Sequence, residues 1–117
     1  MNKSMASKIS TSLIISTYNR SDALELCVKS VLRQSLLPDE IIIADDGSKE
    51  ETGELIHQLA TTSVVPIIHV WHEDLGFRLA TIRNKAIVKA TKEYIIQIDG
   101  DIVLHKDFVK DHVRFDL

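Results

Sequence analysis

The chain has 117 residues, of which 44% are hydrophobic and 26% charged, and its formal net charge is −3 at pH 7. This length allows one domain with a modest core, and the composition is that of a soluble globular protein. The slightly acidic balance argues against a nucleic-acid partner, and no apolar run approaches the roughly 20 residues of a membrane span.

The cysteine content and the N-terminus indicate where the protein resides. Cys27 is the single cysteine, so an internal disulfide is excluded and a reducing compartment is expected. Residues 1–12 are polar, lack the apolar segment of a signal peptide and are expected to be flexible. We therefore expect a cytoplasmic protein. Peripheral association with the inner face of the membrane stays open, because an attachment could lie outside this chain.

The first predicted strand covers residues 13–17 and ends in a polar loop at residues 18–20. Either Ser21 or Asp22 can cap the helix that follows. The apolar residues of this helix recur at helical spacing and form one buried stripe: Leu24, Cys27, Val28, Val31 and Leu32. This position makes Cys27 a core residue rather than a nucleophile.

The second predicted strand covers residues 40–44 and ends in Asp-Asp-Gly-Ser at residues 45–48. Ser48 can cap the next helix, and Glu51, three residues on, completes a capping box. The buried side of this helix is expected to carry Leu55, Ile56 and Leu59.

The third predicted strand, residues 64–70, contains Pro66, which places its start at a sheet edge or a bend. A polar loop over residues 71–78 leads to a helix that starts near Leu79. The residues that face inward from this helix are Leu79, Ile82, Ala86, Ile87 and Ala90. A short helix around residues 107–114 closes the chain.

The fourth predicted strand is an apolar run from Tyr94 that ends in two aspartates, Asp99 and Asp101, separated by Gly100. Glycine lets the backbone turn tightly where the strand stops. Two adjacent carboxylates repel each other unless a cation or strong donors offset their charge. The sequence therefore predicts a hard divalent metal here, together with a phosphate-bearing ligand.

Strands alternate with helices, and the strands are uninterrupted apolar runs. This pattern predicts an α/β fold with a mostly parallel sheet and helices on both faces. Three polar clusters, residues 17–20, 45–48 and 99–101, then follow strand carboxyl ends and are expected to line one crevice.

Within the second cluster, Asp46 is the candidate ligand-binding residue. A strand-to-helix turn accounts for Asp45 and Ser48, but one carboxylate is enough for such a turn. The second carboxylate can accept an N–H from a nucleobase or the hydroxyls of a ribose.

Arg78 and Arg83 lie near a helix start, where arginine suits a diphosphate. The alternative is a solvated charge or a salt bridge to Glu73 or Asp74. His69 and His72 have no cysteine or third histidine at zinc-like spacing, and we expect neither to take part in the site.

Four segments in the same order resemble the amino-terminal half of family 2 glycosyltransferases of the GT-A type, and together they span nearly the whole chain. The third is similar to bacterial polysaccharide and chondroitin-type polymerases. The segments are residues 13–20, 41–48, 76–86 and 94–101.

The resemblance implies a nucleotide-sugar donor, most simply a UDP-sugar, a glycan acceptor, and inversion at the anomeric carbon. It implies that Asp46 accepts the uracil N–H, that Asp99 serves the ribose or the metal, and that Asp101 ligates Mn²⁺ or Mg²⁺. The implied nucleotide-sugar-binding residues are Thr17, Tyr18, Asn19, Arg20, Asp46, Arg78, Arg83, Asp99 and Gly100, and the implied metal ligands are Asp99 and Asp101.

Family members continue well beyond this length and carry the acceptor site and the general base there. Residues 13–117 are therefore expected to be the donor-binding part, with no residue assigned as the base. A non-catalytic sugar-nucleotide-binding module is the alternative. A receiver domain would need its acid pair after the first strand, and a nucleotidyltransferase would need a glycine-rich loop with a lysine.

Overall fold

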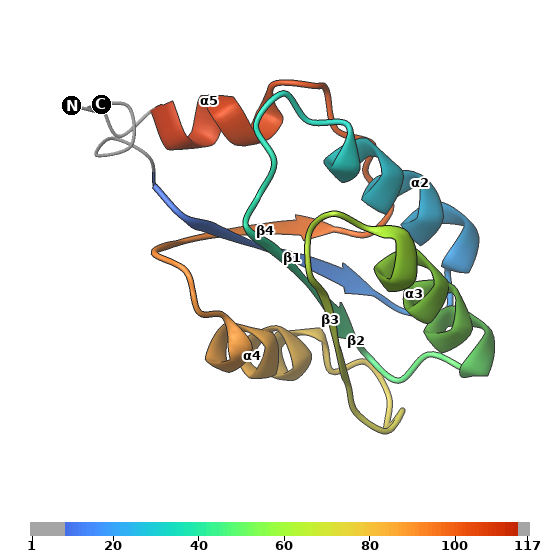
Figure 1. Cartoon of the computed structure of the whole chain (residues 1–117). Coiled ribbons are helices and arrows are strands. Elements are labelled where there is room, and N and C mark those ends of the chain that lie inside the picture. The colour runs from blue at the N-terminus through green and yellow to red at the C-terminus, as the bar shows by residue number, and fades with distance from the viewer. Residues whose placement is uncertain (1–8, 115–117) are drawn as a thin grey trace.

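The computed structural model describes residues 9–114 (Figure 1). Residues 1–8, on which most of the predicted flexible N-terminus falls, and residues 115–117 lie outside the described residues. Four strands pair in parallel in the order β3-β2-β1-β4, which confirms the predicted parallel α/β sheet. The strands are β1 Thr11–Thr17, β2 Glu40–Asp45, β3 Ile67–Trp71 and β4 Tyr94–Asp99.

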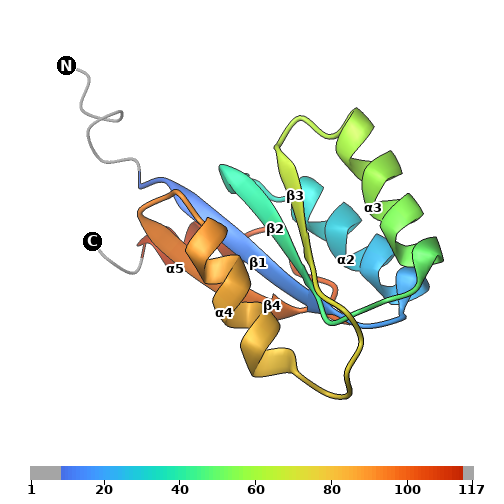
Figure 2. The ribbon, with the colours of Figure 1, turned by 90° about the horizontal axis from the view of Figure 1, so that it is seen from below.

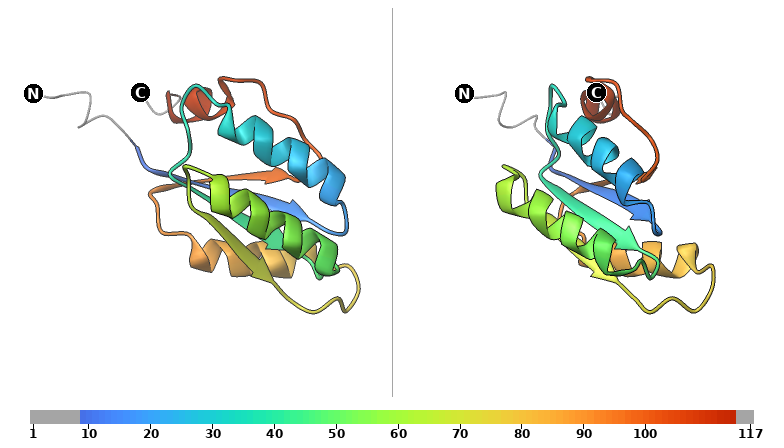
Figure 3. Two further views of the ribbon diagram at one scale, coloured as in Figure 1. Left: turned by 45° about the vertical axis from the view of Figure 1, so that its right-hand side comes forward. Right: turned by 90° about the vertical axis from the view of Figure 1, so that its right-hand side faces the viewer.

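Helices cover both faces of the sheet, as Figure 2 and Figure 3 show from other sides. The helices are α2 Ser21–Leu32, α3 Glu50–Thr62, α4 Leu79–Lys89 and α5 Phe108–Arg114. Helices α2, α3 and α5 lie on one face of the sheet, and α4 lies on the other (Figure 1). In the part of the chain between residues 9 and 114, no helix combines the length and apolarity of a membrane span.

The two central strands alternate their side chains between two cores. Leu13 and Ile41 pack with the face covered by α2, α3 and α5, whereas Ile14 and Ile42 pack toward α4. All four are buried, and each contributes about 1.5–3 kcal/mol of apolar transfer free energy. Burial of both faces explains why these strands read as continuous apolar runs rather than as alternating patterns.

Two strand starts differ from the predicted ones. Strand β1 begins at Thr11, whose N–H donates to the Asp39 carboxylate at 2.8 Å, so the chain is ordered before the first apolar residue. Strand β3 begins at Ile67, after Pro66, which has no N–H to donate. The predicted edge position of this strand is confirmed by the sheet order.

The predicted helix caps are wrong. The N-cap residues are Arg20 for α2 and Lys49 for α3, and neither helix has a side-chain cap hydrogen bond. The Ser48 hydroxyl instead accepts the backbone N–H of Asn19 at 2.7 Å. This oxygen therefore joins the β1–α2 loop to the β2–α3 loop rather than capping a helix.

The Cys27 thiol is fully buried, as predicted, and burial raises its pKa to about 11. The thiolate is the reactive form, so we expect Cys27 to resist Ellman's reagent at neutral pH in the native chain. Reaction should become rapid when urea unfolds the protein. Stoichiometric labelling of the native chain at the rate of a free thiol would contradict the buried position.

Candidate functional site

A cavity of about 200 Å³ lies at the carboxyl ends of β1, β2 and β4. It brings together seven of the residues predicted from the sequence, which come from three separate loops. The lining consists of Ser16, Thr17, Tyr18, Arg20, Asp46, Phe77, Leu79, Asp99, Gly100 and Asp101. Of the other predicted residues, Asn19, Arg78 and Arg83 are not part of the lining.

Gly100 allows Asp99 and Asp101, here called the acid pair, to reach this cavity. Its N–H donates to the Ser16 carbonyl at 2.7 Å. A Cβ at this position would lie 2.6 Å from the same oxygen, which is too close for any other residue. The end of β4 can therefore turn against β1 with Asp99 and Asp101 on either side of the turn.

Asp99 is held by neighbours on two elements. Its Oδ1 accepts from the Arg83 guanidinium at 2.7 Å and from the Ser16 hydroxyl at 3.2 Å. This pair is substantially exposed, with 36% and 58% of the two side chains accessible, so it fixes geometry more than it stabilises the fold. Within residues 9–114, the Asp101 carboxylate makes no hydrogen bond or ion pair.

The acid pair fits a hard divalent cation held jointly with a ligand. No group of three or more potential metal-ligating side chains occurs among the described residues. Mg²⁺ commonly binds through one or two carboxylates plus substrate phosphates. Two carboxylates beside an open cavity match that donor set, with Asp101 free to ligate and Asp99 held in place by Arg83.

Asp46 is the most constrained carboxylate in the cavity. Its side chain is 4% exposed, and its Oδ1 lies 2.6 Å from Nε2 of His72. Its Oδ2 accepts the backbone N–H of Arg78 at 2.9 Å. Arg78 therefore contributes to the site through its main chain, at the residue before α4 begins.

Neither His69 nor His72 lines this cavity, but both contact aspartates at the end of β2. His72 contacts Asp46, and Nε2 of His69 lies 2.8 Å from Oδ2 of the buried Asp45. Both contacts follow from the pairing of β2 with β3, which places Trp71 beside Asp45. Placing the third strand next to the second would have brought the histidines to the two aspartates.

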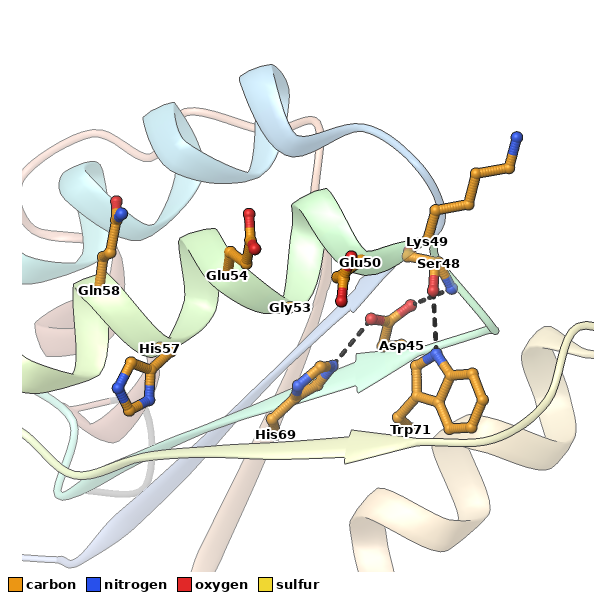
Figure 4. A pocket seen from close by; sticks show the side chains of 10 residues that line it. All are labelled: Asp45, Ser48, Lys49, Glu50, Gly53, Glu54, His57, Gln58, His69 and Trp71. Carbon is orange, nitrogen blue, oxygen red and sulfur yellow. Dashed lines mark hydrogen bonds and ion pairs between the residues drawn. The ribbon is translucent and has the colours of Figure 1, made fainter.

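A larger cavity of about 740 Å³ lies between α3 and β3 (Figure 4) and contains none of the predicted site residues. Asp45 faces it, but its carboxylate is already bonded to His69 and to the N–H of Ser48 at 2.9 Å. The Trp71 indole N–H donates to the Ser48 carbonyl. The predicted single crevice is therefore wrong for Asp45 and Ser48, and we place the candidate site in the smaller cavity, where the acid pair lies.

The β3–α4 loop is tied to the β1–α2 loop by Tyr18 and Asp74. The Tyr18 hydroxyl donates to the Asp74 carboxylate at 2.6 Å. This hydrogen bond raises the pKa of Tyr18 and lowers the pKa of Asp74, which also accepts the N–H of Gly76. Tyr18 is thus held at the cavity mouth with half of its surface accessible.

Asn19 adopts a left-handed backbone conformation with φ 48°, and its side-chain oxygen accepts the N–H of Lys49 at 2.8 Å. We expect Asn19→Ala to lower the free energy of unfolding by about 1–2 kcal/mol, because it loses this bond and strains the backbone. Asn19→Gly keeps the backbone conformation and should cost less. Urea denaturation measures both, and wild-type stability of the alanine variant would contradict the argument.

Comparison with known proteins shows the family to which this chain belongs. Residues 12–115 match the family described as Glycosyl transferase family 2. A chondroitin synthase of Escherichia coli is 31% identical over 104 residues, which are 88% of this chain and 15% of that protein. The chain belongs to glycosyl transferase family 2, and it spans a minor part of this relative.

Solved structures support the same fold. The structure of S. aureus TarS 1–349 in complex with UDP-GlcNAc matches with a TM-score of 0.74 at 23% identity. The match covers 92% of this chain and 31% of the TarS chain. A mannosyltransferase from Pyrobaculum calidifontis in complex with GDP-Man and Mn²⁺ matches with a TM-score of 0.70 at 24% identity. The match covers 80% of this chain and 28% of the mannosyltransferase chain. The predicted GT-A-type architecture is confirmed.

Proposed function

We propose that this chain is the donor-binding part of an inverting, metal-dependent glycosyltransferase that uses a UDP-sugar to extend a glycan. The observation that carries the proposal is the shared cavity of Asp46 and the acid pair Asp99 and Asp101. One carboxylate suits the nucleobase and the pair suits a metal and a diphosphate, so one nucleotide can satisfy all three.

The nucleobase of the donor would lie between the ends of β1 and β2. Thr17 and Tyr18 form one wall, and Asp46 accepts a ring N–H of the base. Tyr18 is suited to this role because its phenol is held by Asp74 and its ring remains accessible. Arg20 lines the same cavity from the β1–α2 loop, and the side chain of Asn19 holds this loop to Lys49.

The diphosphate would lie toward the end of β4. Asp101 and Asp99 would hold Mn²⁺ or Mg²⁺, which supplies neutralisation of the departing nucleoside diphosphate. Arg83 keeps Asp99 in position and adds a positive charge beside the phosphates, and the side chain of Arg78 can add another. The UDP-GlcNAc of the S. aureus structure and the GDP-Man and Mn²⁺ of the P. calidifontis structure support a nucleotide sugar and a divalent metal as the ligands.

The activity of the whole protein is part of the proposal. The E. coli relative is a chondroitin synthase, which supports polysaccharide synthesis as the process. We propose a glycan acceptor and a cytoplasmic location, consistent with the single reduced cysteine. No residue of this chain is assigned as the general base.

Chemical-shift mapping of UDP with Mg²⁺ on the ¹⁵N-labelled chain tests the proposal. We expect the largest shifts at residues 17–20, at Asp46 and at residues 99–101. Residues of the larger cavity, such as His57 and Gln58, serve as internal controls and should shift little. Saturable shifts confined to the α3–β3 cavity, or none in a folded chain, would contradict the proposed donor site.

A further inference from the structure

Three side chains from separate segments form a relay that ends at the candidate site. Nζ of Lys85, on α4, lies 3.2 Å from Nδ1 of His72. Nε2 of His72, in the β3–α4 loop, lies 2.6 Å from Oδ1 of Asp46. His72 and Asp46 are 6% and 4% exposed, whereas Lys85 lies at the surface.

The relay fixes which nitrogen of His72 carries hydrogen. A lysine ammonium has three donors and no acceptor, so Nδ1 of His72 must accept. The hydrogen of the neutral imidazole is then on Nε2, where it donates to Asp46. The N–H of Arg78 occupies the other carboxylate oxygen at 2.9 Å. Both oxygens of Asp46 therefore accept, and the group has no hydrogen to offer a ligand.

We propose that His72 and Lys85 are positioning residues that keep Asp46 an acceptor and thereby select the nucleobase. This inference rests on the proposed function, in which Asp46 faces the base. Uracil and guanine present a ring N–H on their pairing edge, which an ionised carboxylate accepts. Cytosine and adenine present a bare ring nitrogen there, so two acceptors would oppose each other in a buried setting.

The selection is a property of the relay rather than of Asp46 alone. Without the ammonium of Lys85, the contact that holds Nδ1 of His72 is lost and the imidazole can rotate away from Asp46. The Asp46 carboxylate then loses its fixed orientation, so it can shift from the bare ring nitrogen of cytosine to the neighbouring amino group, which donates. Loss of Lys85 should therefore change which base is preferred as well as how tightly it binds.

The test compares UDP with CDP, which differ only at the pairing edge of the base. In Lys85→Met, which keeps the apolar stem and removes the charge, we expect the ratio of UDP to CDP affinity to fall by about tenfold or more. Lys89→Met is the matched control, because it removes a lysine from the next turn of α4, away from His72. This control should keep the wild-type ratio.

Two substitutions at His72 separate positioning from packing. His72→Gln retains a donor that reaches toward Asp46 and should preserve much of the UDP preference. His72→Leu retains bulk without a donor and should lose the preference. If His72→Leu fails to fold, the UDP-to-CDP affinity ratio of Lys85→Met still tests the proposal, because Lys85 is exposed.

A readout without nucleotide reports on the relay directly. Long-range ¹H–¹⁵N correlation spectra of His72 should show the Nε2–H tautomer in the free wild-type chain and a mixture in Lys85→Met. An Nδ1–H tautomer in the wild-type chain overturns the inference. So does an unchanged UDP-to-CDP ratio in Lys85→Met, which leaves the proposed function standing. A folded wild-type chain that binds neither nucleotide overturns the proposed function itself.

Discussion

Asp101→Asn should weaken the binding of Mn²⁺ in the presence of UDP by about 10- to 100-fold while leaving the fold intact. The Asp101 carboxylate is exposed and has no partner within residues 9–114, so its removal leaves no buried group unpaired. Its loss takes away one of the two proposed ligands, whereas Asp99 keeps its contact with Arg83. The intensity of the free Mn²⁺ signal in electron paramagnetic resonance measures the effect.

Asp111→Asn provides the control, because it removes the same charge from an exposed position on α5. It should retain Mn²⁺ as the wild-type chain does. Equal retention of Mn²⁺ by both variants would show that Asp101 is not a ligand. Equal loss in both would show that overall charge, rather than the acid pair, attracts the cation.

Gly47→Ala should have the largest effect on stability, a loss of about 2–4 kcal/mol in the free energy of unfolding. Gly47 has φ 93°, and a Cβ there would lie 2.6 Å from the backbone N and Cα of Asp74. The β2–α3 loop can approach the β3–α4 loop this closely only without a side chain. Because Asp46 is the preceding residue, the same change should also displace the carboxylate from His72.

Two other glycines isolate the cause, and thermal or urea unfolding compares all three variants. Gly76 has φ 96° but no atom within 4 Å of an added Cβ, so Gly76→Ala should cost only the backbone term of about 1–2 kcal/mol. Gly53 lies within α3 and would meet only the His69 ring at 3.8 Å, so Gly53→Ala should stabilise by about 0.5–1 kcal/mol. Equal losses at Gly47 and Gly76 would contradict the role of close loop approach.

The fold could be predicted because the two central strands are apolar runs that must be buried on both faces. Residues 41–43 are all fully buried, and only a sheet between helix layers buries three successive side chains in a strand. Boundaries were less predictable where polar groups define them. Thr11 belongs to β1 through its pairing with Tyr94, 83 residues away, and no local sequence pattern indicates that contact.

The candidate site was predictable in part for the same reason. Parallel strands end at one edge, so the clusters at Thr17 and Asp46 and at the acid pair were expected to meet, and they line one cavity. The histidine contacts were missed because they join residues 24 and 26 positions apart, through the pairing of β2 with β3. The predicted Ser48 cap is wrong because the Ser48 hydroxyl instead accepts the backbone N–H of Asn19, from the loop after β1.

Calorimetric titration of UDP into the chain, with and without Mn²⁺, tests whether this cavity binds the nucleotide. We expect saturable binding that Mn²⁺ strengthens, with one nucleotide per chain. The Mn²⁺-dependent part of the heat should disappear in Asp101→Asn. Absence of binding under both conditions, in a sample shown to be folded, would contradict a donor site in this cavity.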